Sequence, residues 1–255
     1  MSAPSSPLAP WPYPRWIAHR GAGKLAPENT LAAFRLGARH GYRMFECDAK
    51  LSSDGVLFLL HDATLERTTN GHGAAGERSM GELAQLDAGG WHSRAYAGEA
   101  MPTLEALARY CLANGHHLNV EIKPTPGQEL ATGRAVGELL SRIWPATAVP
   151  PLLTSFKPAA LTGARETAPA LPRGLLLDKL ADGAADVQTA LDLGCQAMVL
   201  NHALWDAALV ARVHGAGLRA LSYTVNDEWA AERLIALNTD GIITDRVDLF
   251  SPAAT

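Results

Sequence analysis

Short apolar runs alternate with longer stretches of helical periodicity from residue 15 onward. The runs predict strands at residues 16–19, 44–48, 118–122, 151–155, 173–177, 197–200, 218–223 and 241–244. The stretches between them predict helices, among them residues 30–40, 103–114, 128–143 and 228–237. Eight strands with intervening helices predict an α/β fold and, within that class, a (β/α)₈ TIM barrel. A doubly wound open sheet is the alternative that this pattern leaves open.

One further apolar run, residues 56–61, breaks the alternation. It begins only four residues after Leu51, whereas a parallel crossover needs roughly a dozen residues or more. The Ser-Ser-Asp-Gly sequence between the two runs is typical of a turn, so the runs are predicted to form an antiparallel hairpin. If Leu51 lies opposite Val56, the hairpin register places Glu46 opposite His61.

Two segments lie outside the regular alternation. Residues 62–101 are rich in Gly, Thr, Ser and charge, and we predict an insertion there, between the second strand and its helix. Residues 1–14 contain five prolines and are predicted to be an extended leader, without the basic start or apolar stretch of a signal peptide. Residues 15–255 are then one barrel domain, in which Asn29 is expected to cap the first helix.

Composition narrows the class of protein. Hydrophobic residues make up 47% of the 255 positions and charged residues 19%, which allows a sizeable core. The net charge of −4 and the absence of a Lys/Arg block argue against nucleic acid as a partner. No apolar run approaches the roughly 18 residues that span a bilayer, so stable membrane insertion is not expected. Three scattered cysteines predict reduced thiols and a cytoplasmic protein, and the oligomeric state stays open.

Charged and imidazole side chains gather where β runs end. The set consists of His19 and Arg20, Glu46 and Asp48, His61, and Glu121 and Lys123. Each has an ordinary structural explanation when taken singly, such as a histidine in a turn or a salt-bridged pair on a strand. In a barrel, however, these strand ends share one rim, where active sites lie. The strand period of two turns Glu46 and Asp48 inward together and Cys47 toward the helices.

The chemistry of this set is specific. Three carboxylates on one rim predict a hard divalent cation, Mg²⁺ or Ca²⁺, in preference to zinc. Two imidazoles suit proton transfer near neutral pH, and the Arg and Lys side chains suit a bound phosphate. The residues therefore predict metal-assisted phosphoryl chemistry on a small phosphate ester.

The sequence resembles the glycerophosphodiester phosphodiesterase family. The resemblance rests on A-H-R-G at 18–21, A-P-E-N-T at 26–30, E-C-D at 46–48, D-G at 54–55, H-D at 61–62, R-T-T-N-G at 67–71, P-T-L at 102–104 and E-I-K-P at 121–124. It continues more weakly through residues 154–156, 223–226 and 240–245, and so covers nearly the whole chain beyond the leader.

The resemblance implies hydrolysis of glycerophosphodiesters to sn-glycerol 3-phosphate and an alcohol, through a cyclic phosphate. It implies a TIM barrel with a small insertion and assigns a role to each site residue. By resemblance, Glu46, Asp48 and Glu121 hold the metal, His19 and His61 are the acid–base pair, Arg20 and Lys123 bind phosphate, and Glu28 belongs to the same site. Tyr223 stands where the family often has Trp, and Phe156 is a second candidate for the wall around the substrate.

Two other functions remain open at this point. A lysophospholipase D-like enzyme would share the site and act on lipid-tailed substrates, although Trp91 and Tyr96 are the only large aromatic residues in the insertion. A non-catalytic phosphate-binding scaffold is the alternative outside enzymes, and the complete set of acids and histidines argues against it.

Overall fold

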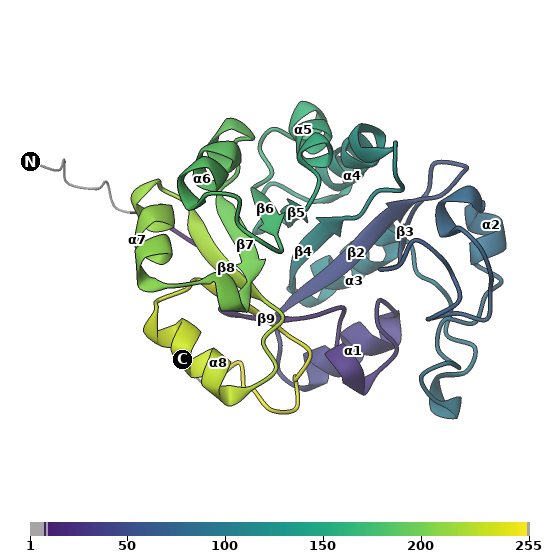
Figure 1. Ribbon diagram of the computed structural model, residues 1–255. Coiled ribbons are helices and arrows are strands. Elements are labelled where there is room, and N and C mark those ends of the chain that lie inside the picture. Colours follow the sequence, from purple (N-terminus) through teal and green to yellow (C-terminus); the bar gives the residue numbers. More distant parts are fainter. Residues whose placement is uncertain (1–7, 9, 254–255) are drawn as a thin grey trace, which may run out of the picture.

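The computed structural model describes residue 8 and residues 10–253 of the chain (Figure 1). Eight parallel strands close into a barrel, because β1 pairs with β9 on one side and with β2 on the other. These strands are β1 (Trp16–Ala18), β2 (Met44–Leu51), β4 (His117–Ile122), β5 (Leu152–Ser155), β6 (Arg173–Leu177), β7 (Ala197–Asn201), β8 (Arg219–Tyr223) and β9 (Gly241–Thr244). The predicted (β/α)₈ barrel is confirmed, and the open-sheet alternative is wrong.

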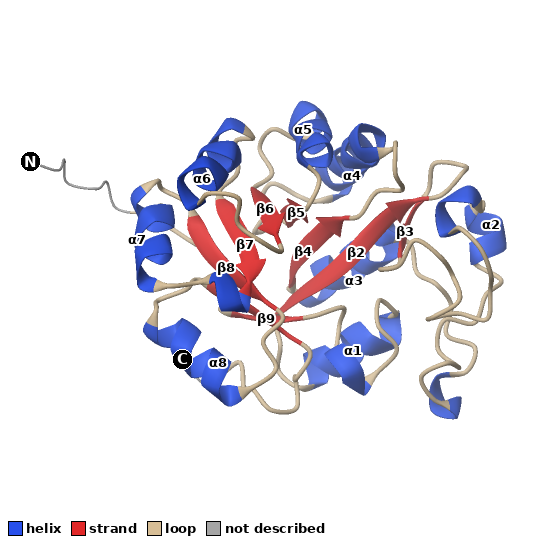
Figure 2. Cartoon of the chain, viewed as in Figure 1, coloured by secondary structure: helices blue, strands red, loops and turns tan. Residues whose placement is uncertain are grey.

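Helices surround the barrel (Figure 2). They are α1 (Leu31–Arg39), α3 (Leu104–Asn114), α4 (Glu129–Ile143), α5 (Pro158–Thr167), α6 (Gly183–Asp192), α7 (Ala207–Gly215) and α8 (Glu228–Ala236), with short 3₁₀ turns η1 (Gly23–Leu25) and η4 (His202–Leu204). Thr103 and Asp227 show why these helices begin where they do, since each side chain accepts a hydrogen bond from the first turn. No helix in the described part of the chain combines the length and apolar character needed to cross a bilayer.

The start of α1 corrects one prediction. Thr30, not Asn29, is the N-cap, and its hydroxyl accepts a hydrogen bond from the Ala33 amide. Asn29 has a φ of 59°, in the left-handed region, and its side chain turns away from the helix to Asp48 on β2. The prediction was wrong because Asn and Thr are both good caps, and only the contact across the fold decides between them.

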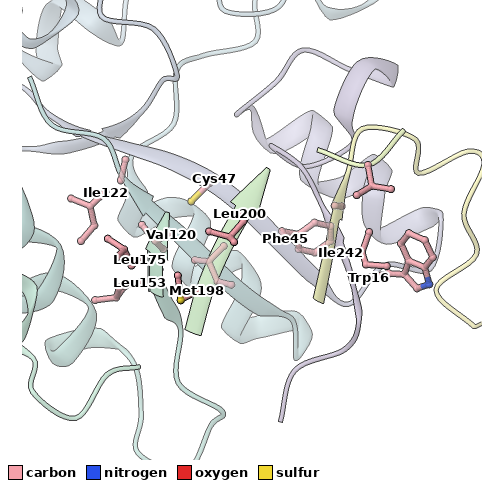
Figure 3. Close-up of a cluster of buried hydrophobic side chains, with 14 of the residues drawn as sticks. Trp16, Phe45, Cys47, Val120, Ile122, Leu153, Leu175, Met198, Leu200 and Ile242 are labelled. Atoms are coloured by element: carbon pink, nitrogen blue, oxygen red, sulfur yellow. The ribbon is translucent and has the colours of Figure 1, made fainter. Parts of the chain in front are cut away.

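Strand alternation sorts the buried apolar side chains into two shells. The outer shell lies between strands and helices and includes Phe45 and Cys47 of β2 (Figure 3), which confirms the predicted direction of Cys47. The inner shell fills the barrel below the site and includes Ile17 and Met44. Tyr13 joins this inner shell and donates its hydroxyl to the carbonyl of Pro150 at 2.8 Å. Of the predicted leader, residues 1–7 and 9 lie outside the described residues.

The hairpin after β2 is confirmed, but its register is not. β3 (Leu57–Leu59) pairs antiparallel with β2, and Leu51 lies opposite Leu57 instead of Val56. The loop is one residue shorter than predicted, because Ser52 already pairs with Val56 through its amide at 2.9 Å. Gly55 allows this tight turn with a φ of +81°. The predicted pairing of Glu46 with His61 is therefore wrong, and His61 instead follows the end of β3.

The segment between β3 and α3 carries η2 (Ala75–Glu77), α2 (Met80–Leu83) and η3 (Arg94–Tyr96). Ser79 and Glu82 form a reciprocal capping box at the start of α2. A small separate core lies under this segment, made of Phe58, Leu60, Leu65, Ala75, Leu83, Ala88 and Met101. This core anchors the segment to the hairpin, so that the residues directly after β3 have a fixed position beside the barrel.

Candidate active site

Three carboxylates meet at the carboxyl ends of β2 and β4. Asp48 and Glu121 are register partners on the two neighbouring strands, and Glu46 is one alternation below Asp48 on the same face. Carboxylate oxygens of all three residues lie within 4.8 Å of one another. The three acids predicted to act together therefore lie together. The strands that carry them pack against the helices through the outer shell of apolar side chains.

The electrostatics of these acids are unfavourable without a cation. Burial raises the pKa of Glu46 well above its usual range, and the charges of Asp48 and Glu121 raise it further. Burial, and then Asp48, raises the pKa of Glu121 to about 7. The Glu46 Oε1 atom is buried and has no hydrogen-bond partner within the described residues. An orphaned carboxylate oxygen beside two further carboxylates is a donor set suited to a hard divalent cation.

Asp48 is the acid that its surroundings keep ionised. Burial raises its pKa, but the charges of Arg20 and Lys123 outweigh burial and hold the pKa below the usual range. Lys123 Nζ lies 3.3 Å from Oδ1, and Arg20 Nε lies 3.2 Å from Oδ2. The Asn29 side chain both donates to Oδ2 at 2.8 Å and accepts from the Asp48 amide at 3.2 Å. This clamp fixes the Asp48 carboxylate in one orientation.

His19 lies beside the carboxylates and is held from behind by another acid. Its Nδ1 is 2.7 Å from Oδ1 of Asp245, which directly follows β9, while its Nε2 is 3.7 Å from Oε2 of Glu46. Asn226 donates to the other Asp245 oxygen at 2.9 Å. Burial raises the pKa of Asp245, but the hydrogen bond and charge of His19 outweigh it and lower the pKa to about 2. An ionised Asp245 therefore orients the ring and leaves Nε2 facing the site.

His61 has the same arrangement with a different acid. Its Nδ1 is 2.7 Å from Oδ1 of Asp62, the next residue in the chain. Arg67 donates to both oxygens of Asp62, at 2.6 and 2.9 Å. Burial lowers the pKa of His61, and the charge of Asp48 opposes that effect. The ring is thus in electrostatic contact with the carboxylate cluster, and a carboxylate fixes which nitrogen is free.

Glu28 joins this histidine to the rest of the site. Arg67 donates to both Glu28 oxygens at 2.8 Å, and Arg20 donates to Oε1, also at 2.8 Å. The two arginines, Glu28 and Asp62 therefore form a continuous ion-pair network across the rim. The two residues predicted to bind phosphate are paired with acids of the site. Arg20 contacts Glu28 and Asp48. Lys123 Nζ lies 3.0 Å from Glu121 Oε1 and 3.3 Å from Asp48 Oδ1.

The two predicted wall residues lie together at the ends of β5 and β8. The rings of Phe156 and Tyr223 meet edge to face with centroids 5.8 Å apart. The Tyr223 hydroxyl donates to the Leu177 carbonyl at 2.9 Å. Burial raises the pKa of Tyr223, as do the charges of Asp178 and Glu121, so the ring stands near the carboxylate cluster.

A cleft of about 370 Å³ opens beside His19. His19, Arg20, Glu28 and Arg67 line its inner side, and Trp91 of the segment after β3 lies at its edge with 41% of its surface exposed. The cleft therefore leads from the bulk solvent to the histidine and the ion-pair network.

Comparison with known proteins identifies the family to which the chain belongs. A sequence profile described as the glycerophosphoryl diester phosphodiesterase family matches residues 19–249. The chain belongs to this family. The matched residues contain every member of the carboxylate cluster, both histidines and the acids that orient them.

Similar proteins carry the same family name. A glycerophosphodiester phosphodiesterase from Caldanaerobacter subterraneus is 33% identical over 238 residues, which cover 90% of this chain and 93% of that protein. One from Bacillus subtilis is 30% identical over 253 residues, covering 92% and 84%. The solved structure of an Oleispira antarctica phosphodiesterase in complex with the product sn-glycerol-3-phosphate has a TM-score of 0.89 and 34% identity, covering 95% of this chain and 97% of that one.

Sequence reasoning missed several residues of this phosphodiesterase site. Asp245 and Asp62 went without a role, although each follows a strand end, which is the signal that pointed to His19. Lys50 continues the inward alternation of β2 beyond Asp48, and its Nζ donates to the Lys123 carbonyl at 3.2 Å. Burial, and then the charge of Lys123, lowers the pKa of Lys50 to about 8. Extending the period of two by one step would have found it.

Proposed function

We propose that this phosphodiesterase hydrolyses glycerophosphodiesters to sn-glycerol 3-phosphate and an alcohol with a bound divalent cation and two histidines. The observation that carries the proposal is the arrangement around Glu46. One buried oxygen of this residue has no partner within the described residues, two further carboxylates lie beside it, and His19 Nε2 is 3.7 Å from its other oxygen. A binding scaffold has no need of two histidines that are each oriented by a carboxylate.

Glu46, Asp48 and Glu121 would hold the cation, Mg²⁺ or Ca²⁺, because all three offer hard oxygen donors. When bound, the cation polarises a phosphoryl oxygen and favours ionisation of a hydroxyl near it. Arg20 and Lys123 add positive charge at the same rim. Both are now paired with the carboxylates, so we expect a bound phosphate to compete for their donor hydrogens.

His19 and His61 would move the protons. His19 Nε2 removes the proton of the attacking glycerol hydroxyl as its oxygen bonds to phosphorus, and His61 Nε2 gives a proton to the leaving alcohol oxygen as its bond to phosphorus breaks. Water then opens the resulting cyclic phosphate while the two histidines act in reverse. Asp245 and Asp62 stabilise each ring when it carries two protons, as the carboxylate of a Ser-His-Asp triad does.

The remaining site residues would bind the substrate. Phe156 and Tyr223 offer a wall of two rings to the glycerol or alcohol carbon atoms. Glu28 would keep Arg20 pointing at the phosphate site through their hydrogen bond. We assign residues 62–101 to the family insertion, residues 1–14 to the leader and residues 15–255 to the catalytic domain. The three free, buried cysteines support a cytoplasmic location.

A coupled assay for sn-glycerol 3-phosphate tests the proposal. Glycerophosphocholine, glycerophosphoethanolamine and glycerophosphoglycerol are offered with added Mg²⁺ or Ca²⁺, and again with excess chelator. We expect release of glycerol 3-phosphate with cation and loss of release with chelator. A parallel incubation with lysophosphatidylcholine tests the lipid-tailed alternative. Turnover of that substrate alone, or full turnover of any substrate in chelator, would contradict the proposal.

A further inference from the structure

A second, positively charged groove lies on the outer wall of the barrel. It has a volume of about 630 Å³ and runs between α1 and α3, which are labelled in Figure 2. Arg35 and Arg39 reach it from α1, and Arg43 reaches it from the residues just before β2. None of the residues that line it belongs to the active site, so its properties are independent of the proposed reaction.

The charge of this groove is not neutralised. None of its lining residues is acidic, and within the described residues none of the three arginines has a carboxylate within ion-pairing distance. Elsewhere in the described residues, eight arginines do face an acid, such as Arg109 with Glu105 at 2.7 Å. Three guanidinium groups without counterions present donors that fit phosphate oxygens.

Aromatic residues form the other walls. Tyr96 of η3 and Tyr110 of α3 line the groove and are half-buried, and the Tyr110 and His116 rings lie 5.8 Å apart. His116 is only 6% exposed, and its Nδ1 has no hydrogen-bond partner within the described residues. Burial, followed by the charge of Arg43, lowers the pKa of His116, so the arginine charge reaches the ring. Arginines and flat rings therefore share one concave surface.

We propose that this groove binds a ligand with several phosphate charges next to a planar ring, the chemistry of a nucleoside polyphosphate. The phosphates lie against Arg35, Arg39 and Arg43, and the planar ring packs against Tyr96 or Tyr110. A volume of this size lies within the range that ordinary small-molecule sites occupy. Arginine is suited to both parts of such a ligand, because its planar fork pairs with phosphate and also stacks on rings.

Isothermal titration of the full-length protein tests this proposal. Adenosine triphosphate and inorganic triphosphate are the probes, in the presence of chelator so that a cation at the carboxylates does not contribute. We expect both to bind, the nucleotide more tightly, with affinity that falls as salt rises. Excess glycerol 3-phosphate should not displace the nucleotide, because the groove shares no residue with the active site.

Two variants locate the binding. Replacing Arg39 and Arg43 together, R39Q with R43Q, should weaken both probes about tenfold or more, since each lost charge-assisted contact reduces affinity. R212Q is the matched control, because Arg212 is an exposed arginine in the last turn of α7 as Arg39 is in α1. It should leave both affinities unchanged. No binding of either probe at millimolar concentration, equal losses in the two variants, displacement by glycerol 3-phosphate, or equal affinity for the two probes would each overturn the proposal.

Discussion

His19 Nδ1 and Asp245 Oδ1 lie 2.7 Å apart although 226 positions separate them in the chain. The contact follows from barrel closure: β1 and β9 are neighbours, Ala18 is the register partner of Thr244, and the next residue on each strand reaches the rim. A parallel barrel thus aligns the first and last strands so that an acid supports a histidine. The parallel pairing of β2 with β4 aligns Asp48 with Glu121 in the same way.

Asp245→Asn should therefore lower kcat strongly while the protein stays folded. The amide cannot stabilise a doubly protonated ring, so we expect a loss on the order of 10²–10⁴-fold, the usual range for acid–base groups. Asp240→Asn is the matched control, because Asp240 also pairs with a histidine, His214, at 2.8 Å. This second pair is not part of the active site. The control variant should leave kcat unchanged. Similar losses in both variants would mean that the effect is structural.

The same aspartate makes a pH-dependent contribution to stability. Its pKa falls from 3.8 to about 2 on folding, so the stabilisation is fully present above pH 4 and is lost as pH falls through 2. A shift of this size corresponds to roughly 2 kcal/mol. Denaturant unfolding of wild type and Asp245→Asn should show the wild type more stable at pH 7 and a gap that narrows toward pH 2. A gap that stays constant across this range would show that folding does not lower the pKa of Asp245.

Strand positions and the inward acids could be predicted because they depend on local alternation. The strand ends at Ile122, Ser155, Leu177 and Tyr223 were predicted to the residue, since each is followed by a break in the apolar run. The hairpin register could not be predicted, because it depends on whether Gly55 closes a three- or four-residue loop. The strand-end position of Asp245 could mark it as a rim residue, but its partner His19 and the contact of Asn29 with Asp48 could not be predicted, because these contacts join segments that only the folded barrel brings together.

The carboxylate cluster is expected to support activity and cation binding while lowering the stability of the cation-free protein. Glu46→Gln should abolish most activity. It should also weaken cation binding, measured by calorimetry, by more than the roughly 10–100-fold that is typical when a residue supporting a metal ligand is changed. In chelator, however, the variant should melt at a higher temperature than wild type, because a neutral amide avoids the cost of burying an acid whose ionised form burial and the charges of Asp48 and Glu121 disfavour. Asp48→Asn and Glu121→Gln should likewise lose most activity. Glu138→Gln, at an exposed groove on α4, should change neither quantity. Unchanged cation affinity in Glu46→Gln would refute the ligand assignment.

The position of α1 depends on Gly37. A Cβ at this residue would lie 2.1 Å from the carbonyl oxygen of Gly21, which follows Arg20 at the end of the first strand. Gly37→Ala should therefore destabilise the protein by about 1–3 kcal/mol through overpacking. Gly215→Ala at the end of α7 is the control, since nothing lies within 4 Å of its Cβ position. Equal stabilities of the two variants in denaturant unfolding would show that α1 does not pack this closely.

In the proposed mechanism, His19 and His61 are separate proton-transfer groups, one serving the attacking oxygen and the other the leaving oxygen. The most direct test compares His19→Ala and His61→Ala on a natural glycerophosphodiester and on the p-nitrophenyl ester of glycerol phosphate. Each variant should lose on the order of 10²–10⁴-fold in kcat on the natural substrate. p-Nitrophenol leaves with little need of a proton, so the ester should largely rescue His61→Ala and leave His19→Ala impaired. The reverse pattern would exchange the two roles, and near-wild-type rates of both variants on the natural substrate would remove both histidines from the mechanism.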